Sequence, residues 1–589
     1  MEGLKTNKHT IFVTGAEDLD IKLSTEEVEA GLEIIKLVIN SPEPINMPKI
    51  TISWNHPLID IHSYWYPTAF RHKSLHADWD RGFFSKATIS APVACLYSVS
   101  GENKLTCAYS DALDTINVNM GVHEEDSTLA CKIVLFTEPS KKRSTYEGEI
   151  RIDTRTVPYY QSIKEVSSWW ESYEHYKPAF VPEVARQPMY STWYSFHQQL
   201  VEAEIEKQCK TAKELGCEAI IVDDGWQTSD NNRGYAYCGD WQVSKERISD
   251  MKAHVKRVHE IGLKYILWYS VPFVGLHSAA WNRFKEYTLC YYDNLKAGVL
   301  DPRYPQVREY LISVYENAIK EWDLDGLKLD FIDQFDLPAE KIDQYNDMMD
   351  FLSVQEAVDC LFSNIIHKLR GIKPDIMLEF RQRYIGPYMR KYGNMFRVTD
   401  CPNDSITNRM GTMDIRLLCG NTAAHSDMLM WNSNETAESA ALQLINVLFS
   451  VPQFSMKFEN LSEEHFKITT FWLKFWKKHR NVLMDGNLVP HNPELNYPLI
   501  TSTTKEEHII VSYSKVIAPI GKDMPHTLIL VNGTLTSRMI FEIEENLEHR
   551  TLEVLNCLGE VVRKENLSLN KGLFSIDIPA AGVAYLTKD

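Results

Sequence analysis

The stretch Ala219-Ile-Ile-Val-Asp-Asp-Gly-Trp226 is a short apolar run that ends abruptly in two adjacent acids. A run of this length, rich in β-branched residues and closed by glycine, is typical of a buried strand in a parallel sheet. A second such run, Gly326-Leu-Lys-Leu-Asp330, also ends in an acid. Longer amphipathic segments stand between runs of this kind, which is the pattern of βα units.

Eight candidate strands of this kind occupy about residues 185–480. They are residues 189–194, 219–222, 264–269, 326–329, 376–380, 395–399, 428–431 and 451–456. Helical periodicity fills the gaps, over residues 201–215, 251–261, 306–322, 354–369, 437–447 and 463–479. Eight such units predict a (β/α)₈ barrel, whose active site lies at the C-terminal ends of the strands.

The two flanks of the barrel alternate apolar and polar residues with a period of two. Short runs of this kind, separated by turn-forming stretches, are typical of β-sandwiches. We therefore predict an N-terminal β-sandwich over residues 1–180, the barrel over 181–483, and a C-terminal antiparallel β-sandwich over 484–589. One helix is expected within the first sandwich, at residues 26–39.

Composition excludes several classes of protein. The chain has 62 Lys and Arg against 80 Asp and Glu, a net charge of −18, so nucleic acid is not an expected partner. No run of about 18 uncharged apolar residues is present, so no membrane partner is expected. Eleven cysteines without a C-x-x-C pair predict neither a disulfide framework nor a structural zinc site, and we expect no metal or cofactor. The first residues are polar, and we expect a cytoplasmic location.

Acids end several of the predicted strands. Asp223 and Asp224 end the second, Asp330 the fourth and Asp400 the sixth. Any single aspartate could instead cap a helix or form an ion pair. Four acids at one mouth of a barrel, two of them adjacent and mutually repelling, indicate a ligand whose hydroxyl groups bind them.

Donors and aromatic faces accompany these acids. Lys328 and Arg381 supply cationic donors, and the sequence places tryptophans at or near strand ends, namely Trp193, Trp226, Trp241 and Trp268. Most of the 14 tryptophans must pack in the core. Acids, donors and flat apolar faces together suit a pyranose, so we predict a carbohydrate ligand.

Cleavage of a glycosidic bond requires two carboxyl groups, and Asp330 and Asp400 are the predicted pair. Lys328 and Asp330 share the inward face of one strand, so we expect Lys328 to keep Asp330 ionised as a nucleophile. Asp400 would act as the general acid, provided that a less polar environment raises its pKa. Asp333 and Asp404 are the alternatives, and both lie further into the loops.

Six motifs, in this order, resemble those of glycoside hydrolase family 36, the α-galactosidases and their raffinose-synthase relatives. They are Tyr190-Ser-Thr-Trp-Tyr, Ile220-Ile-Val-Asp-Asp-Gly-Trp-Gln, Gly262-Leu-Lys-Tyr-Ile-Leu-Trp, Leu300-Asp-Pro-Arg-Tyr-Pro, Gly326-Leu-Lys-Leu-Asp-Phe and Val398-Thr-Asp. The resemblance covers about residues 185–435. It implies the same barrel with β-rich flanks.

The resemblance also implies roles for single residues. Asp330 would form a glycosyl-enzyme and Asp400 would be the acid/base, with retention of configuration. Asp223, Asp224, Lys328 and Trp193 would bind galactose, together with Arg381 or Arg383, of which we favour Arg381. Around the acids the chain departs from the family, at Lys328-Leu-Asp-Phe-Ile, Glu379-Phe-Arg-Gln-Arg and Thr399-Asp-Cys-Pro.

In place of the changed motifs, the segment His425-Ser-Asp427 near the seventh strand is a candidate to close the pocket. Asp427 would close the pocket there, although a buried His425–Asp427 pair is an equal alternative. The expected function is retaining hydrolysis of terminal α-D-galactosyl residues. A galactosyltransferase of the raffinose-synthase kind and a catalytically silent carbohydrate-binding protein are the alternatives. The expected partner is a carbohydrate substrate, and a homo-oligomer is possible because members of this family often assemble.

Overall fold

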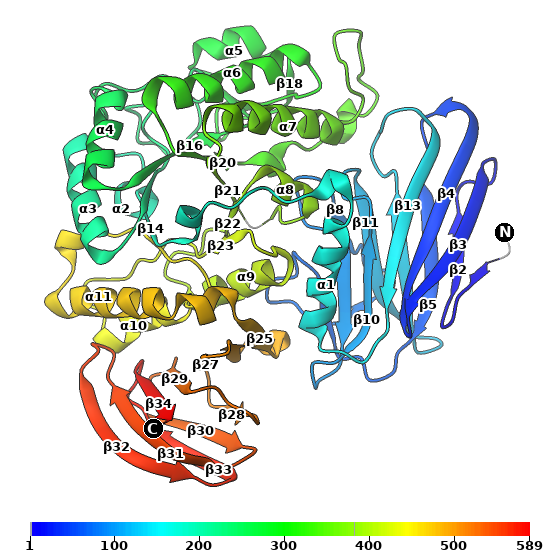
Figure 1. Cartoon of the computed structure of the whole chain (residues 1–589). Helices are drawn as coiled ribbons and strands as arrows, with labels where there is room; N and C mark the ends of the chain where they lie inside the picture. The colour runs from blue at the N-terminus through cyan, green and yellow to red at the C-terminus, as the bar shows by residue number, and fades with distance from the viewer. Residues whose placement is uncertain (1–2, 382, 589) are drawn as a thin grey trace.

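The computed structural model describes residues 3–381 and 383–588. Three bodies follow one another along the chain: a β-sandwich, an α/β barrel and a second β-sandwich (Figure 1). The two sandwiches contact different sides of the barrel, and helix α1 (Tyr159–Glu171) lies between the first sandwich and the barrel. The predicted fold class is confirmed.

Eight parallel strands form the barrel. Their order is β14 (Met189–Ser191), β15 (Ala219–Val222), β16 (Lys264–Ser270), β20 (Gly326–Asp330), β21 (Met377–Arg381), β22 (Met395–Arg397) and β23 (Ala423–His425), with β24 (Gln453–Phe454) beside β14. Isolated bridges from His425 to Val451 and from Leu429 to Phe454 close the ring between β23 and β24. The C-terminal ends of all eight strands therefore surround one mouth.

Helices cover the outside of this ring. They include α3 (Glu202–Leu215), α4 (Met251–Ile261), α6 (Pro305–Trp322), α7 (Val354–Ile372), α8 (Pro387–Tyr392), α9 (Ser405–Leu418), α10 (Ala437–Ile445) and α11 (Glu463–Lys478). Local sequence sets their ends. Ser353 caps α7 by accepting a hydrogen bond from the Glu356 amide. Gly216 ends α3 at φ 101°, a conformation that glycine adopts without strain.

The seventh strand lies earlier than predicted. Residues 428–431 were the expected strand, whereas β23 spans Ala423–His425. The sequence Ala-Ala-His lacks the β-branched residues found in strands such as β15. It forms a strand because it pairs with β22 on one side and with the segment before β24 on the other. The position of this strand is therefore set by tertiary packing and not by the local sequence pattern.

The N-terminal sandwich consists of two sheets. One contains β1 (Leu4–Lys5), β2 (Thr10–Thr14), β5 (Ile50–Pro57), β12 (Thr128–Leu135), β11 (Ile116–His123), β7 (His76–Ala77) and β8 (Phe83–Ser85). The other contains β3 (Asp20–Glu29), β4 (Leu32–Ile45), β13 (Arg143–Asp153), β10 (Asn103–Tyr109), β9 (Val93–Tyr97) and β6 (Ser63–Trp65). Their facing side chains form a separate core.

The prediction of a helix at residues 26–39 is wrong. These residues belong to the antiparallel hairpin of β3 and β4, which turns at Gly31, at φ 87°. Ile34, Ile35 and Ile39 are β-branched and pair across the sheet, and this outweighs the helical spacing of the acids before them.

The C-terminal sandwich again has two sheets. The larger contains β25 (Asn487–His491), β26 (Leu499–Thr503), β27 (Glu507–Ser512), β29 (Thr527–Asn532), β34 (Val583–Lys588), β31 (Leu547–Leu555) and β32 (Val561–Leu569). The smaller contains β28 (Ile517–Ile520), β30 (Arg538–Ile543) and β33 (Gly572–Asp577). A further small sheet, β17 (Phe273–Gly275), β19 (Ala297–Leu300) and β18 (Thr288–Tyr292), stands beside the barrel mouth, after β16.

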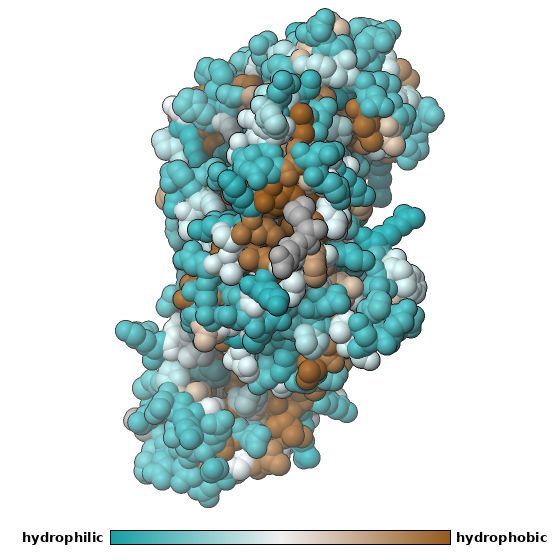
Figure 2. Space-filling view, turned by 90° about the vertical axis from the view of Figure 1, so that its right-hand side faces the viewer, coloured by the Kyte–Doolittle hydropathy of each residue, from teal (hydrophilic) through white to brown (hydrophobic). Residues whose placement is uncertain are grey.

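The surface is mostly polar. The face on the side of the first sandwich is largely hydrophilic, with a hydrophobic area near its centre (Figure 2). None of the helices in the described part of the chain combines the length and the apolar character needed to cross a bilayer.

Asp325 stabilises the foot of the barrel, opposite the mouth. It accepts hydrogen bonds from the Tyr265 amide at 2.9 Å and from Lys264 at 3.0 Å, and it lies 2.6 Å from His259 Nε2. Burial would raise its pKa, but these partners and Lys373 lower it well below its usual range. Asp325→Ala is expected to cost about 3 kcal/mol, because it leaves buried donors without their acceptor.

The measurement is the thermal midpoint of both proteins at several pH values. Since the folded pKa of Asp325 is lowered, its contribution is full above the unfolded pKa of about 4 and is lost as the pH falls through the folded value. The difference in midpoint must therefore shrink in acid. Glu260→Ala, on exposed surface of α4, is the control and should leave the midpoint unchanged.

Candidate active site

Asp330 ends β20 at the barrel mouth and is 6% exposed. Trp268 Nε1 donates a hydrogen bond to Asp330 Oδ2 at 3.0 Å, and the Phe331 amide donates to Oδ1 at 2.8 Å. Phe331 adopts φ 62°, which is uncommon for a bulky residue and turns the chain sharply after the carboxylate. Both carboxylate oxygens are thus fixed by donors, as a positioned nucleophile requires.

The cation in contact with Asp330 is Arg381, not Lys328 as predicted. Arg381 Nε lies 2.6 Å from Asp330 Oδ1, whereas Lys328 Nζ lies 2.5 Å from Asp223 Oδ2. Lys328 and Asp330 do share the inward face, but Asp223, from the neighbouring loop, reaches Lys328. Of the two candidate arginines, Arg381 is nearly buried, and the Arg383 side chain is 60% exposed.

Asp400 follows β22, and its side chain is 43% exposed. Arg397 Nη2 donates a hydrogen bond to Asp400 Oδ1 at 2.8 Å. Partial burial would raise the pKa of Asp400, but the charges of Arg397, Lys328 and Arg381 outweigh it and lower the pKa to about 2. The expected rise in this pKa is therefore wrong for the sugar-free protein, because a buried arginine on the preceding strand contacts the carboxylate.

The negative charges of Asp330 and Asp400 both affect the pKa of Arg381. Burial would lower the pKa of Arg381, but the negative charges around it, first Asp330 and then Asp333 and Asp400, raise it. Asp330 and Asp400 come from β20 and from the end of β22, and Arg381 ends β21 between them. Asp330 thus contacts Arg381 directly, whereas Asp400 contacts Arg397 and acts on Arg381 through its charge.

Asp427 lies behind Asp400 and is completely buried. It lies 2.5 Å from Arg397 Nη1 and accepts hydrogen bonds from Tyr194 at 2.8 Å and from the Cys401 amide at 2.6 Å. Burial raises its pKa, and Arg397 opposes this rise. Asp427 thus supports the pocket wall from behind. His425 bonds elsewhere, to the Ala185 carbonyl and to Gln453.

Asp223 and Asp224 are adjacent in sequence but contact different partners. Asp223 pairs with Lys328, while Asp224 accepts hydrogen bonds from Gln198 and Gln227, each at 2.7 Å. Burial raises the pKa of Asp224 to about 7, although the two glutamines act in the opposite direction. Asp224 therefore changes charge near neutral pH, at the pocket.

Asp224→Asn is expected to change the pH dependence of stability. A raised folded pKa in an acid means that wild-type stability falls as the pH rises from about 4 through about 7, by an order of a few kcal/mol. The amide cannot ionise, so the thermal midpoint of the variant should fall less over this range and exceed that of wild type at pH 8. Parallel pH curves for the two proteins would contradict the assignment.

The tryptophans divide into wall and core. Trp193, in α2 (Trp193–Phe196), is partly exposed and packs edge-on against His197. Trp268 is 1% exposed, and its indole N–H donates the hydrogen bond to Asp330. Trp226 is fully buried, donates to the Trp268 carbonyl and stacks on Trp241. This places Trp226 in the core, and not on the wall where a sugar face was expected.

The two alternative acids differ in their placement. Asp404 caps α9 by accepting from the Thr407 amide and pairs with Arg71 at 2.9 Å, so its role is structural. Asp333 is buried near Arg381 and Arg383, at 3.9 and 3.6 Å, and burial raises its pKa. Asp333 thus stays close to the site, and the charge of Asp330 acts on it.

The comparison with protein families decides the assignment of this region. Residues 163–379 match the melibiase family model. The match covers less than half of the chain. It runs from within α1 to within β21 and includes Asp223, Asp224, Lys328 and Asp330 but not Asp400.

Known α-galactosidases are similar in sequence to parts of the chain. The chain is 27% identical to the α-galactosidase Mel36A of Lactobacillus acidophilus over 202 residues, which is 32% of this chain and 26% of that protein. It is 26% identical to the α-galactosidase AgaA of Geobacillus stearothermophilus over 148 residues, 24% of this chain and 19% of that one. The alignments thus span about a quarter or less of these relatives.

Solved structures extend the likeness in fold. The crystal structure of the GH36 α-galactosidase AgaA superposes with a TM-score of 0.66 at 13% identity, covering 98% of this chain and 83% of that one. The α-galactosidase TtGalA of Thermus thermophilus gives 0.54 at 14% identity, covering 81% and 97%. The resemblance to family 36 seen in the sequence is confirmed.

Several residues around the candidate site were not predicted from sequence. Arg397, Tyr194, Gln198 and Gln227 contact its acids. Glu379 is buried inside the barrel near Arg397 Nε, at 3.7 Å, and accepts from Gln453 at 2.5 Å. A usable signal existed for Arg397 and Glu379, since charged residues within apolar strands must find buried partners.

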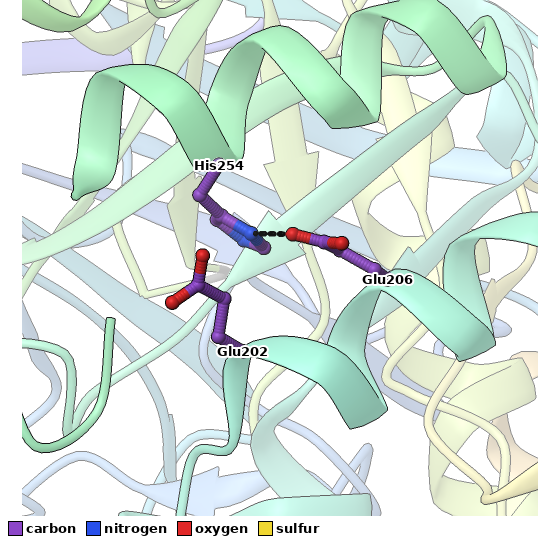
Figure 3. Close-up of side chains that lie close together, drawn as sticks. All are labelled: Glu202, Glu206 and His254. Carbon is purple, nitrogen blue, oxygen red and sulfur yellow. Dashed lines mark hydrogen bonds and ion pairs between the residues drawn. The ribbon is translucent and has the colours of Figure 1, made fainter. Parts of the chain in front are cut away.

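One cluster of possible metal ligands lies outside the mouth of the barrel. Glu202 and Glu206 on α3 face His254 on α4 (Figure 3). Arg257 contacts both carboxylates, and Glu206 lies 2.8 Å from His254 Nδ1. Both carboxylates are thus already bound by Arg257, and the cluster is an ion-pair network that joins two outer helices.

Proposed function

We propose that the chain is a retaining exo-glycosidase that hydrolyses terminal α-D-galactosyl residues. The observation that carries the proposal is that Asp330, in contact with Arg381, and Asp400 both follow strands that end at the same mouth of the barrel, where the Asp223–Lys328 ion pair also lies. Two carboxyl groups of this kind are what glycosidic cleavage needs. The relatives add support, because AgaA variants have been crystallised with raffinose and with stachyose, and TtGalA with p-nitrophenyl α-D-galactopyranoside.

In the proposed reaction, an Asp330 oxygen attacks the anomeric carbon while the bond to the leaving oxygen breaks. Asp400 gives its proton to that oxygen. A water then attacks the same carbon, loses a proton to Asp400 and releases Asp330, so the configuration is retained. Two donors and Arg381 hold the Asp330 carboxylate in one orientation, and this avoids reorganisation during attack.

Asp400 has to take up a proton before it can act as the acid. Its partner Arg397 favours the carboxylate in the sugar-free protein. A bound sugar removes water from the side chain, which disfavours the charged form and raises the pKa. Proton uptake would thus accompany substrate binding.

Galactosyl transfer is the second candidate. A carboxylate that is ionised at rest is ready to accept a proton from an attacking hydroxyl, and that hydroxyl can belong to a sugar as well as to water. Transfer and hydrolysis use the same glycosyl-enzyme. Products formed from an aryl α-galactoside with and without added sucrose separate the two, because transfer gives a galactosyl-sucrose and hydrolysis gives free galactose.

The test of the proposed function is a panel of aryl glycosides. Turnover of the α-galactoside, with little or none of the α-glucoside and β-galactoside, is expected. NMR should detect α-galactose as the first product. A β-anomer first would contradict the retaining mechanism, and a protein that binds galactose without turnover of any member would be a silent binder.

A further inference from the structure

A carboxylate lies inside the barrel, below the mouth. Glu379 is the third residue of β21 and is completely buried, and Arg381 ends the same strand two residues later. Side chains two residues apart on a strand share a face, so both point into the barrel. Glu379 also pairs in register with Lys328 of β20, on the same inward face. It begins one of the segments in which the chain departs from family 36, and a buried charge of this kind needs partners.

The guanidinium of Arg397 faces three carboxylates, and Glu379 is one of them. Arg397 Nη2 lies 2.8 Å from Asp400 Oδ1, Nη1 lies 2.5 Å from Asp427 Oδ1, and Nε lies 3.7 Å from Glu379 Oε1. Among the residues that the structure describes, neither Arg397 Nε nor Glu379 Oε1 forms a hydrogen bond elsewhere. Arg397 is 1% exposed, so its charge must be offset by these acids and not by water.

The second oxygen of Glu379 is held by a chain of buried polar groups. Gln453 Nε2 donates to Glu379 Oε2 at 2.5 Å and approaches His425 Nδ1 at 3.1 Å. His425 Nε2 lies 2.7 Å from the Ala185 carbonyl, which can only accept, so Nε2 carries the proton. Burial lowers the pKa of His425 to about 4, and its Nδ1 is therefore an acceptor. The amide of Gln453 must present both N–H groups, which turns Glu379 Oε1 toward Arg397.

This arrangement matters because Asp400 changes charge during the proposed reaction. Each time Asp400 is protonated, its attraction for Arg397 weakens. Asp427 on Nη1 and Glu379 on the Nε side keep their charges and act on different nitrogens of the same planar group. Together they fix the plane of the guanidinium, so Nη2 stays directed at Asp400.

We propose that Glu379 is a positioning residue for the acid/base step, and that it acts by holding Arg397 in the orientation in which Arg397 binds Asp400. This inference rests on the proposed function. Glu379 lies below the mouth and does not touch the sugar. Its negative charge also offsets that of Arg397, so that the cation does not hold Asp400 permanently as an anion.

The experiment replaces Glu379 by Gln, which removes the charge and nearly keeps the shape. The guanidinium would then be less well oriented and would favour the Asp400 anion more strongly, so protonation of the leaving oxygen should slow. General acid catalysis is worth about 10²–10⁴-fold, and a partial loss should lower kcat/KM for raffinose by about tenfold to 100-fold. The value for α-galactosyl fluoride, whose leaving group needs no proton, should fall by about threefold or less.

Two further variants separate the charge from the fold. Glu379→Asp keeps the charge and should recover most of the raffinose activity, and a loss as large as that of Glu379→Gln would overturn the role of the charge. Glu356→Gln is the matched control, because Glu356 is also buried but lies on α7 beside Lys141, outside the barrel. It should behave as wild type on both donors.

The ratio of the two donors decides the inference. Equal loss on raffinose and the fluoride in Glu379→Gln, or no loss on either, overturns the positioning role and leaves the proposed function intact. If the thermal midpoint shows that this variant does not fold, Gln453→Met decides, because it removes the donor to Glu379 without changing any charge. A loss confined to raffinose supports the inference, and an equal loss or none overturns it. A wild-type protein that cleaves neither donor overturns the proposed function itself.

Discussion

Asp330→Ala is expected to lower kcat on an aryl α-galactoside by about 10⁴-fold or more. Removal of a nucleophile leaves only binding and electrostatic effects to accelerate the reaction. Asp330 is the carboxylate that holds contacts to Trp268, the Phe331 amide and Arg381 at once, so no neighbouring group can take its geometry. Asp333 is near, but its contacts with Arg381 and Arg383 are longer ion pairs, at 3.9 and 3.6 Å.

Added azide distinguishes loss of the nucleophile from loss of the fold. A small anion can enter the space left by the carboxylate and attack the anomeric carbon, and the product would be a β-galactosyl azide. Asp404→Ala is the control, because Asp404 caps a helix nearby and its loss should cost about 1 kcal/mol without loss of turnover. Near-normal turnover by Asp330→Ala would refute the assignment.

The barrel and the identity of its acids could be predicted from sequence. A strand in a parallel sheet is a short apolar run, and the acid that ends it must lie at the mouth, so Asp223, Asp330 and Asp400 followed from chain order alone. Strand β23 could not be predicted in this way, because its Ala-Ala-His sequence depends on neighbouring strands.

Partners across the site were beyond a single sequence. The spacing along β20 predicted an ion pair between Lys328 and Asp330. In the folded chain Asp223, which follows β15, forms the ion pair with Lys328 instead. Trp226 illustrates a second limit, since a tryptophan after a strand gives the same signal whether it faces a sugar or the core. The pKa of Asp400 depended on Arg397, whose direction is a property of the folded strand.

Asp400→Asn is expected to slow the first step only for those substrates whose leaving group needs a proton. General acid catalysis is worth about 10²–10⁴-fold, so kcat/KM for raffinose should fall by about 10³-fold. Fluoride leaves without a proton, so the attack on α-galactosyl fluoride should continue. The galactosyl-enzyme should then accumulate, because the second step lacks its base, and a burst of fluoride should precede slow turnover.

The pH dependence of wild type tests the same residue without relying on the variant alone. The pKa of Asp400 is lowered to about 2, so its protonated fraction in the free protein falls as the pH rises. Only raffinose needs that proton. The ratio of kcat/KM for raffinose to kcat/KM for α-galactosyl fluoride should therefore fall between about pH 4 and pH 7, and it should stay constant in Asp400→Asn. A constant ratio in wild type would mean that another group protonates the leaving oxygen, and Arg397 would then hold Asp400 as a permanent anion beside the sugar.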